Sequence, residues 1–152
     1  MNIADINKRL RRVQKFNVEI SSANDCLAAG QGTVDVENNT PGSITWRENG
    51  RWNHHFNYLE FTNVYRWSGL YDSRLGLEHL RYGDQNPVKL VELVKTSKNF
   101  WISACPHLCG QDSYQLTMSI NANELTMVWH IDGPDKNQIS TICYSYKGSL
   151  NK

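Results

Sequence analysis

The sequence lacks a dominant charge, a long apolar stretch and a segment typical of secretion. Its 16 lysines and arginines nearly balance its 15 aspartates and glutamates, which leaves a net charge of +1. Dedicated nucleic-acid-binding domains carry a strong basic surface, so this balance argues against that class. No run approaches the roughly 20 apolar residues of a membrane-spanning helix, and residues 1–16 contain no signal-peptide core of about 7–15 apolar residues. We therefore expect a cytoplasmic protein without nucleic-acid or membrane partners.

Cysteine is scarce, with four residues in 152. Disulfides are rare in cytoplasmic proteins, and a chain of this length can bury enough surface to fold without them. Cys105, His107, Cys109 and Asp112 are close in sequence, but they lack the second ligand pair of a structural zinc site. We expect no metal there. A cysteine nucleophile beside His107 remains an alternative, although the motifs of common hydrolases and nucleotide-binding enzymes are absent.

Alternation of apolar and polar residues runs through most of the chain. It is clearest over 114–120, where Tyr114, Leu116, Met118 and Ile120 share one face. Turn signals such as Asn49-Gly50, which we interpret as a hairpin turn, separate the alternating segments. No helical crossovers intervene, so neighbouring strands should pair antiparallel. The pattern predicts an all-β fold, an up-and-down barrel of about eight to ten strands, with a two-sheet sandwich as the alternative.

The first residues show a helical rather than a strand period. Ile6, Leu10 and Val13 recur at helical spacing, Asp5 stands early and basic residues follow, as the helix dipole favours. We expect a short helix or arm over 1–13 and a single barrel domain over 14–150.

Two charged residues continue apolar faces and are candidates for function. Glu48 follows Trp46 at strand spacing, and Arg81 follows His79. A buried charge costs several kcal/mol unless it is paired, so the two side chains should lie at the barrel mouth or pair with each other. The functional alternative is that the two side chains form the polar end of an apolar pocket. Its aromatic walls would come from Trp46, Trp67, Tyr114 and Trp129.

The C-terminal third carries a motif that resembles a known family. It reads His107-x-Cys109-Gly110-x-Asp112-x-Tyr114, followed by Trp129, Gly133-Pro134-x-Lys136 and Tyr144. Gly30-x-Gly32, Trp46-x-Glu48-x-Gly50 and Tyr65-Arg66-Trp67 extend the match over most of residues 14–147. The pattern resembles a family of small lipocalin-like domains of unknown function.

This resemblance implies a calycin-type β-barrel and no particular activity. It adds Arg66, His107 and Lys136 to the expected ligand-binding residues. The segment Leu77-Glu78-His79-Leu80-Arg81 departs from the family, in which an Asp-Gly-Arg turn followed by Phe is typical.

Three functions follow from these patterns. The first is binding of a small apolar or aromatic ligand with an anionic or carbonyl head inside the barrel, by a monomer or homodimer. The second is a small cofactor-free isomerase or lyase that uses Glu48 with His79 or His107. The third is a protein-interaction domain, which requires a barrel filled by side chains and an exposed apolar patch.

Overall fold

The computed structural model describes residues 3–22, 25–38, 40–53, 58–70 and 74–148. Within these ranges the chain forms one helix and eleven strands. Their bounds are α1 (Ile3–Arg11), β1 (Val13–Ser22), β2 (Asp25–Glu37), β3 (Ile44–Asn53), β4 (Tyr58–Ser68), β5 (Arg74–His79), β6 (Val88–Ser97), β7 (Phe100–Ser103), β8 (His107–Cys109), β9 (Asp112–Ile120), β10 (Glu124–Gly133) and β11 (Lys136–Tyr146).

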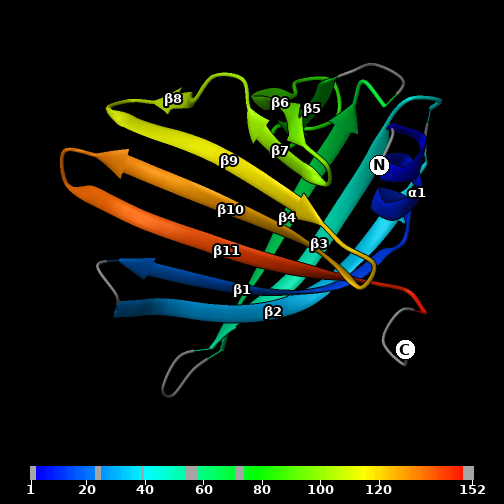
Figure 1. Cartoon of the computed structure of the whole chain (residues 1–152). Coiled ribbons are helices and arrows are strands. Elements are labelled where there is room, and N and C mark those ends of the chain that lie inside the picture. The colour runs from blue at the N-terminus through cyan, green and yellow to red at the C-terminus, as the bar shows by residue number, and fades with distance from the viewer. Residues whose placement is uncertain (1–2, 23–24, 39, 54–57, 71–73, 149–152) are drawn as a thin grey trace.

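Ten of the strands form a closed antiparallel barrel. Strands β1 to β7 pair in chain order, β7 pairs with β9, and β9, β10 and β11 continue the ring back to β1. The short strand β8 pairs only with β9 and extends that strand as a hairpin (Figure 1). The predicted all-β, up-and-down barrel with a short N-terminal helix is confirmed. Closure of the ring excludes the two-sheet sandwich.

The inward faces follow the alternation in the sequence. On β9, for example, Leu116, Met118 and Ile120 are buried, while Thr117 and Ser119 between them are half-buried or exposed. Burial of each such side chain stabilises the fold by about 1.5–3 kcal/mol, so the pattern fixes which face of each strand turns inward.

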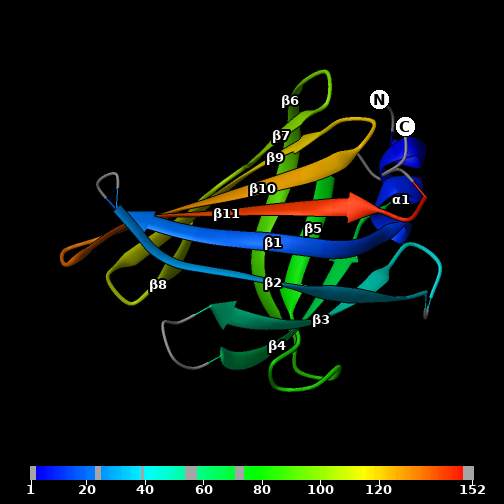
Figure 2. The same ribbon diagram turned by 90° about the horizontal axis from the view of Figure 1, so that it is seen from below.

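Helix α1 covers one end of the barrel (Figure 2). Ile6 and Leu10 lie on one side of the helix and are fully buried, whereas Lys8 and Arg12 face solvent. Val13 already pairs with Tyr146 of β11, so the first strand begins two residues after the helix ends. No helix within the described residues combines the length and apolarity needed to cross a membrane.

The Asn49-Gly50 pair does not form the hairpin turn that its sequence suggests. Both residues lie within β3, where Gly50 pairs with Gly32 of β2. A β-carbon on Gly32 would collide with the paired backbone at Asn49 and Gly50 and come within 2.7 Å of Phe16 Cζ. One on Gly50 would collide with the Phe61 ring and come within 2.9 Å of Phe16 Cζ. These glycines therefore make room for aromatic rings inside the barrel, and that packing overrides the local turn preference.

A bulge in β6 changes which residues face inward. Leu77 pairs with Val91 and Glu78 with Lys89, so Leu90 is an extra residue in its strand. Leu90 and Val91, although adjacent, both turn toward the interior: Leu90 lines a cavity and Val91 is buried in the core. Such a bulge shifts the alternation by one residue and bends the strand.

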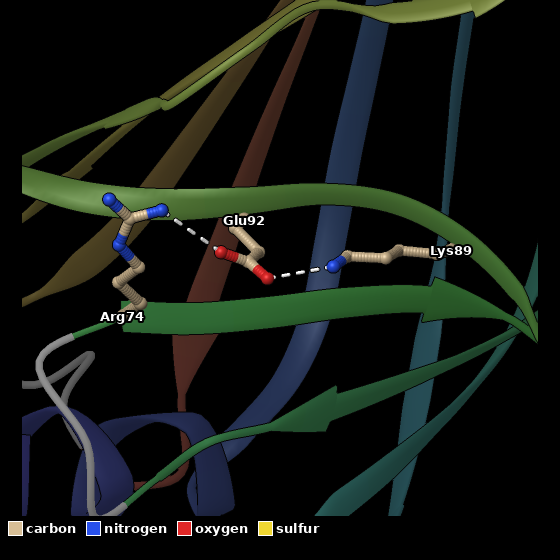
Figure 3. A network of polar contacts seen from close by, with 3 residues as sticks. All are labelled: Arg74, Lys89 and Glu92. Carbon is tan, nitrogen blue, oxygen red and sulfur yellow. Dashed lines mark hydrogen bonds and ion pairs between the residues drawn. The ribbon is translucent and has the colours of Figure 1, made fainter.

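The same shift places Lys89 and Glu92, three residues apart, on the outer wall. Glu92 lies between the Lys89 ammonium group and the Arg74 guanidinium, with contacts of 2.7 and 3.2 Å (Figure 3). Lys89 and then Arg74 lower the pKa of the Glu92 carboxyl. Exposed ion pairs of this kind contribute little to stability.

The glycine pair gives a direct test of the packing. We expect Gly32→Ala to lower the free energy of unfolding by about 1–3 kcal/mol, because the added methyl group overpacks the space between the β3 backbone and the Phe16 ring. The measurement is urea denaturation, with Thr33→Ala on the exposed face of the same strand as the control. Equal stability of the two variants would contradict this account.

Candidate functional site

The half of the barrel next to α1 is filled by an aromatic plug, defined here as Trp46, Trp67 and Tyr144. All three side chains are at most 1% exposed. The ring of Trp46 lies 5.4 Å from that of Trp67 and 4.8 Å from that of Tyr144. Its Nε1 donates a hydrogen bond of 2.9 Å to the carbonyl oxygen of Leu10. The plug therefore joins the helix to the barrel wall and fills the barrel lumen at this end.

The other half contains a cavity of about 490 Å³. Its walls come from strand ends remote from α1 and from the residues that follow β5. Its exposed margin includes Arg81 and Tyr82, so it reaches the surface. The lining residues are Ile20, Asn63, Tyr65, His79, Arg81, Tyr82, Val88, Leu90, His107, Cys109, Tyr114, Trp129, Ile131 and Ser140. Apolar and aromatic walls with a few polar groups are typical of small-molecule sites.

One wall is a series of edge-to-face aromatic contacts. The Tyr114 ring lies 6.4 Å from the Trp129 ring and 6.1 Å from the His107 ring. His107 and Tyr114 face each other across the β8–β9 hairpin, whose turn contains Gly110 at φ 62°, a conformation that glycine adopts without strain. The hairpin thus extends the cavity wall beyond the end of the barrel.

His79 is a polar group of the cavity, and both of its ring nitrogens tie it to neighbouring residues. Its Nδ1 accepts a hydrogen bond of 3.0 Å from the Arg81 backbone N–H, and Nε2 lies 3.4 Å from Asn63 Oδ1. The Tyr65 ring meets the imidazole edge-on at 5.0 Å. Burial, and then the charge of Arg81, lower the His79 pKa. The imidazole is therefore neutral at pH 7 and carries its proton on Nε2.

Arg81 lies at the cavity mouth but not on a strand. Strand β5 ends at His79, and Leu80 begins a turn in which the Gly83 N–H donates to the Leu80 carbonyl. The Arg81 guanidinium lies over the Tyr82 ring at 6.0 Å. Of our two alternatives for these charges, Arg81 does lie at the mouth, but the prediction that it continues the His79 face and pairs with Glu48 was wrong. The strand ends before Arg81, and Glu48 bonds to a different partner.

Glu48 lies beneath the cavity, at the edge of the plug, and is 3% exposed. Its Oε2 accepts a hydrogen bond of 2.5 Å from the Tyr144 hydroxyl, and Asn63 faces it on the paired strand. Burial raises the pKa of Glu48 to about 7, although hydrogen bonds from Tyr144 and Asn63 oppose the rise. Burial and the Glu48 charge also raise the pKa values of Tyr65 and Tyr144. The carboxyl therefore titrates near neutral pH without a cationic partner among the described residues.

The structure brings together most of the residues singled out in the sequence. His79, Arg81, His107, Tyr114 and Trp129 line the cavity, whereas Trp46 and Trp67 belong to the plug and Glu48 is buried at its edge.

Two of the expected site residues lie elsewhere. Arg66 pairs with Glu78 on the neighbouring strand at 3.0 Å, on the outer wall. Lys136 begins β11 and does not line the cavity.

Several lining residues were missed by sequence reasoning. Asn63 and Tyr65 share the inward face of β4 with Trp67, a signal that the alternation already contained. Tyr82 lies in a turn and carried no such signal. The partner of Glu48, Tyr144, is 96 residues away along the chain.

Among the described residues, no three or more histidines, cysteines and acidic residues are grouped so that they could hold a metal ion.

These features define a closed ten-stranded β-barrel with an aromatic plug at one end and a cavity at the other. The chain belongs to DUF6314, a family of unknown function, whose sequence profile matches residues 11–146. None of the curated proteins matches its sequence significantly. Among solved structures it is similar to a de novo designed fluorescence-activating β-barrel, with a TM-score of 0.45 and 11% identity over 95% of this chain and 99% of the designed one.

The raised pKa of Glu48 predicts that the free energy of unfolding depends on pH. A carboxyl whose pKa rises on folding, here from 4.5 to about 7, keeps its proton in the folded state while the unfolded chain ionises. The free energy of unfolding is therefore unaffected by this titration below pH 4.5. It falls by about 3 kcal/mol as the pH rises toward 7. We expect Glu48→Gln to remove this fall, so its stability relative to the wild type should increase between pH 5 and pH 8.

The measurement is urea denaturation at a series of pH values. Glu19→Gln, at an exposed position on β1, is the matched control. If the curves of wild type and Glu48→Gln remain parallel across this range, Glu48 is not the group that titrates.

Proposed function

We propose that this barrel binds a small, partly apolar ligand with an anionic or carbonyl head in its cavity. The observation that carries the proposal is the cavity of about 490 Å³ at the end opposite the plug. Its volume lies within the range of about 300–1,000 Å³ that is usual for small-molecule sites. Because the plug closes the barrel behind it, a ligand would enter and leave at the open end.

The polar groups indicate how the ligand is oriented. Trp129, Tyr114 and Leu90 offer an apolar surface for its flat or aliphatic body. Arg81 forms no ion pair among the described residues, and its planar guanidinium can donate two parallel hydrogen bonds to a carboxylate. The neutral His79 offers an Nε2–H donor nearby, at present directed to Asn63. A carboxylate, sulfonate or carbonyl head at the mouth fits these donors.

In this proposal the protein is a carrier or sensor of the lipocalin-like, calycin type, as the motif resemblance implies. It acts in the cytoplasm as a monomer or homodimer. The ligand site comprises the predicted residues at the cavity, and Glu48 supports it from beneath through its contact with Asn63 rather than by holding Arg81.

A second candidate is a cofactor-free isomerase or lyase. It is favoured by the polar series Glu48, Asn63 and His79, in which a carboxyl with a pKa of about 7 lies near a neutral imidazole. Such a pair can divide acid and base roles. However, Glu48 does not line the cavity, so a substrate would reach His79 first. The interaction domain is favoured least, because it requires a filled barrel.

The role of Arg81 can be tested with a pair of fluorescent probes. We expect anilinonaphthalene sulfonate, which is anionic, to bind the folded protein with one-to-one stoichiometry. Arg81→Ala should weaken its binding by about 1.5–3 kcal/mol, the range for a hydrogen bond to a charged group. Arg81 does not pair with Glu48, so Arg81→Ala leaves no buried charge without a partner. The larger loss expected when a buried ion pair is broken therefore does not apply.

Two controls make this result specific. Neutral N-phenylnaphthylamine has a similar ring system without the sulfonate, and its affinity should not change in Arg81→Ala. Arg66→Ala removes the same side chain from the outer wall and should leave both affinities unchanged. The assignment of the head group to Arg81 would be contradicted by either of two results. Arg66→Ala could lower the affinity as much as Arg81→Ala, or Arg81→Ala could lower the affinity for both probes equally.

A further inference from the structure

A second hollow, of about 430 Å³, lies at the closed end of the barrel. It is separate from the proposed ligand cavity and shares no lining residue with it. Helix α1, the residue that follows it and the β6–β7 turn meet there. The lining residues are Asp5, Lys8, Arg9, Arg12, Lys98 and Asn99. We refer to this hollow as the basic pocket.

The charge of the basic pocket is unlike that of the whole molecule. Four cationic side chains face one carboxylate here, whereas the chain as a whole carries a net charge of +1. No ion pair within the described part of the chain joins Lys8, Arg9, Arg12 or Lys98 to a carboxylate. A concave surface lined by one sign of charge concentrates the field and attracts counter-ions.

Two of the cations are held in place by groups that do not neutralise them. Arg9 donates from Nη1 to the Asn121 carbonyl at 2.9 Å, and its guanidinium lies over the Tyr146 ring at 5.4 Å. Arg12 donates from Nη2 to the Lys147 carbonyl at 2.8 Å. Each guanidinium has five N–H donors, so each retains donors for another acceptor. Fixed side chains lose less conformational entropy when they bind a ligand.

The β6–β7 turn that presents Lys98 is also fixed. Asn99 has a φ of 66°, a left-handed conformation that asparagine tolerates better than most residues. Its carbonyl oxygen accepts a hydrogen bond of 3.0 Å from the Ile120 N–H, which joins the turn to the end of β9. Helix α1 and the β9–β10 connection lie at this same end of the barrel (Figures 1 and 2).

We propose that the basic pocket binds a soluble small molecule through a phosphate or diphosphate group. Arginine forks match the geometry of phosphate oxygens, and lysines add charge without a fixed direction. The pocket is larger than a single phosphate ion, which leaves room for a second phosphate or for the group that carries it. Bound there, the ligand would contact both α1 and the β6–β7 turn.

Inorganic pyrophosphate is the probe that tests this proposal. Isothermal titration at constant ionic strength should show saturable one-to-one binding to the wild type. In the double variant Lys8→Gln/Lys98→Gln the affinity should fall by about tenfold or more. Arg12→Lys keeps the charge but removes the planar fork, and it should also weaken binding, which a diffuse surface charge would not explain.

The matched control is Lys15→Gln/Lys89→Gln, which removes the same charge from exposed lysines on the outer wall. Its affinity for pyrophosphate should stay within about twofold of the wild type. The proposal is overturned if the wild type shows no saturable binding, or if this control loses as much affinity as the pocket variant. Circular dichroism of each variant confirms that a loss is not due to unfolding.

Discussion

The position of Trp46 inside the barrel determines the arrangement of the rest of the molecule. Its indole hydrogen-bonds the last turn of α1 through Leu10 and packs against Trp67 and Tyr144. Large aromatic rings at this level fill the lumen, so open space is left only beyond them. The Tyr144 hydroxyl then reaches Glu48 at the edge of the plug. Closure at one end, the cavity at the other and the buried carboxyl between them all follow from this packing.

The fold could be read from the sequence because alternation is a local signal. On β9 the inward residues alternate as predicted. Most strands pair with their neighbours along the chain, and the pairing of the first strand with the last closes the ring. The aromatic lining could be read in the same way, since Tyr114 and Trp129 share the inward parity of their strands. Where the alternation is interrupted, as at the Leu90 bulge, the sequence alone did not show which residues turn inward.

The polar part of the site depends on features that a local pattern does not contain. Arg81 reaches the cavity from a turn, and the partner of Glu48 comes from the last strand of the chain. Asn49-Gly50 has the sequence of a turn but occupies a strand, because the rings of Phe16 and Phe61 need the space beside Gly50. The basic pocket likewise combines residues about ninety positions apart, which only the closed barrel brings together.

The central claim is that the barrel beyond the plug holds a small molecule. Native mass spectrometry of the protein purified from its source, without added ligand, tests this most directly. The account predicts one additional small-molecule mass per chain, and its loss in Ile131→Trp, a substitution that fills the cavity. A wild-type chain of unmodified mass, or an Ile131→Trp chain that retains every molecule bound to the wild type, would contradict the claim.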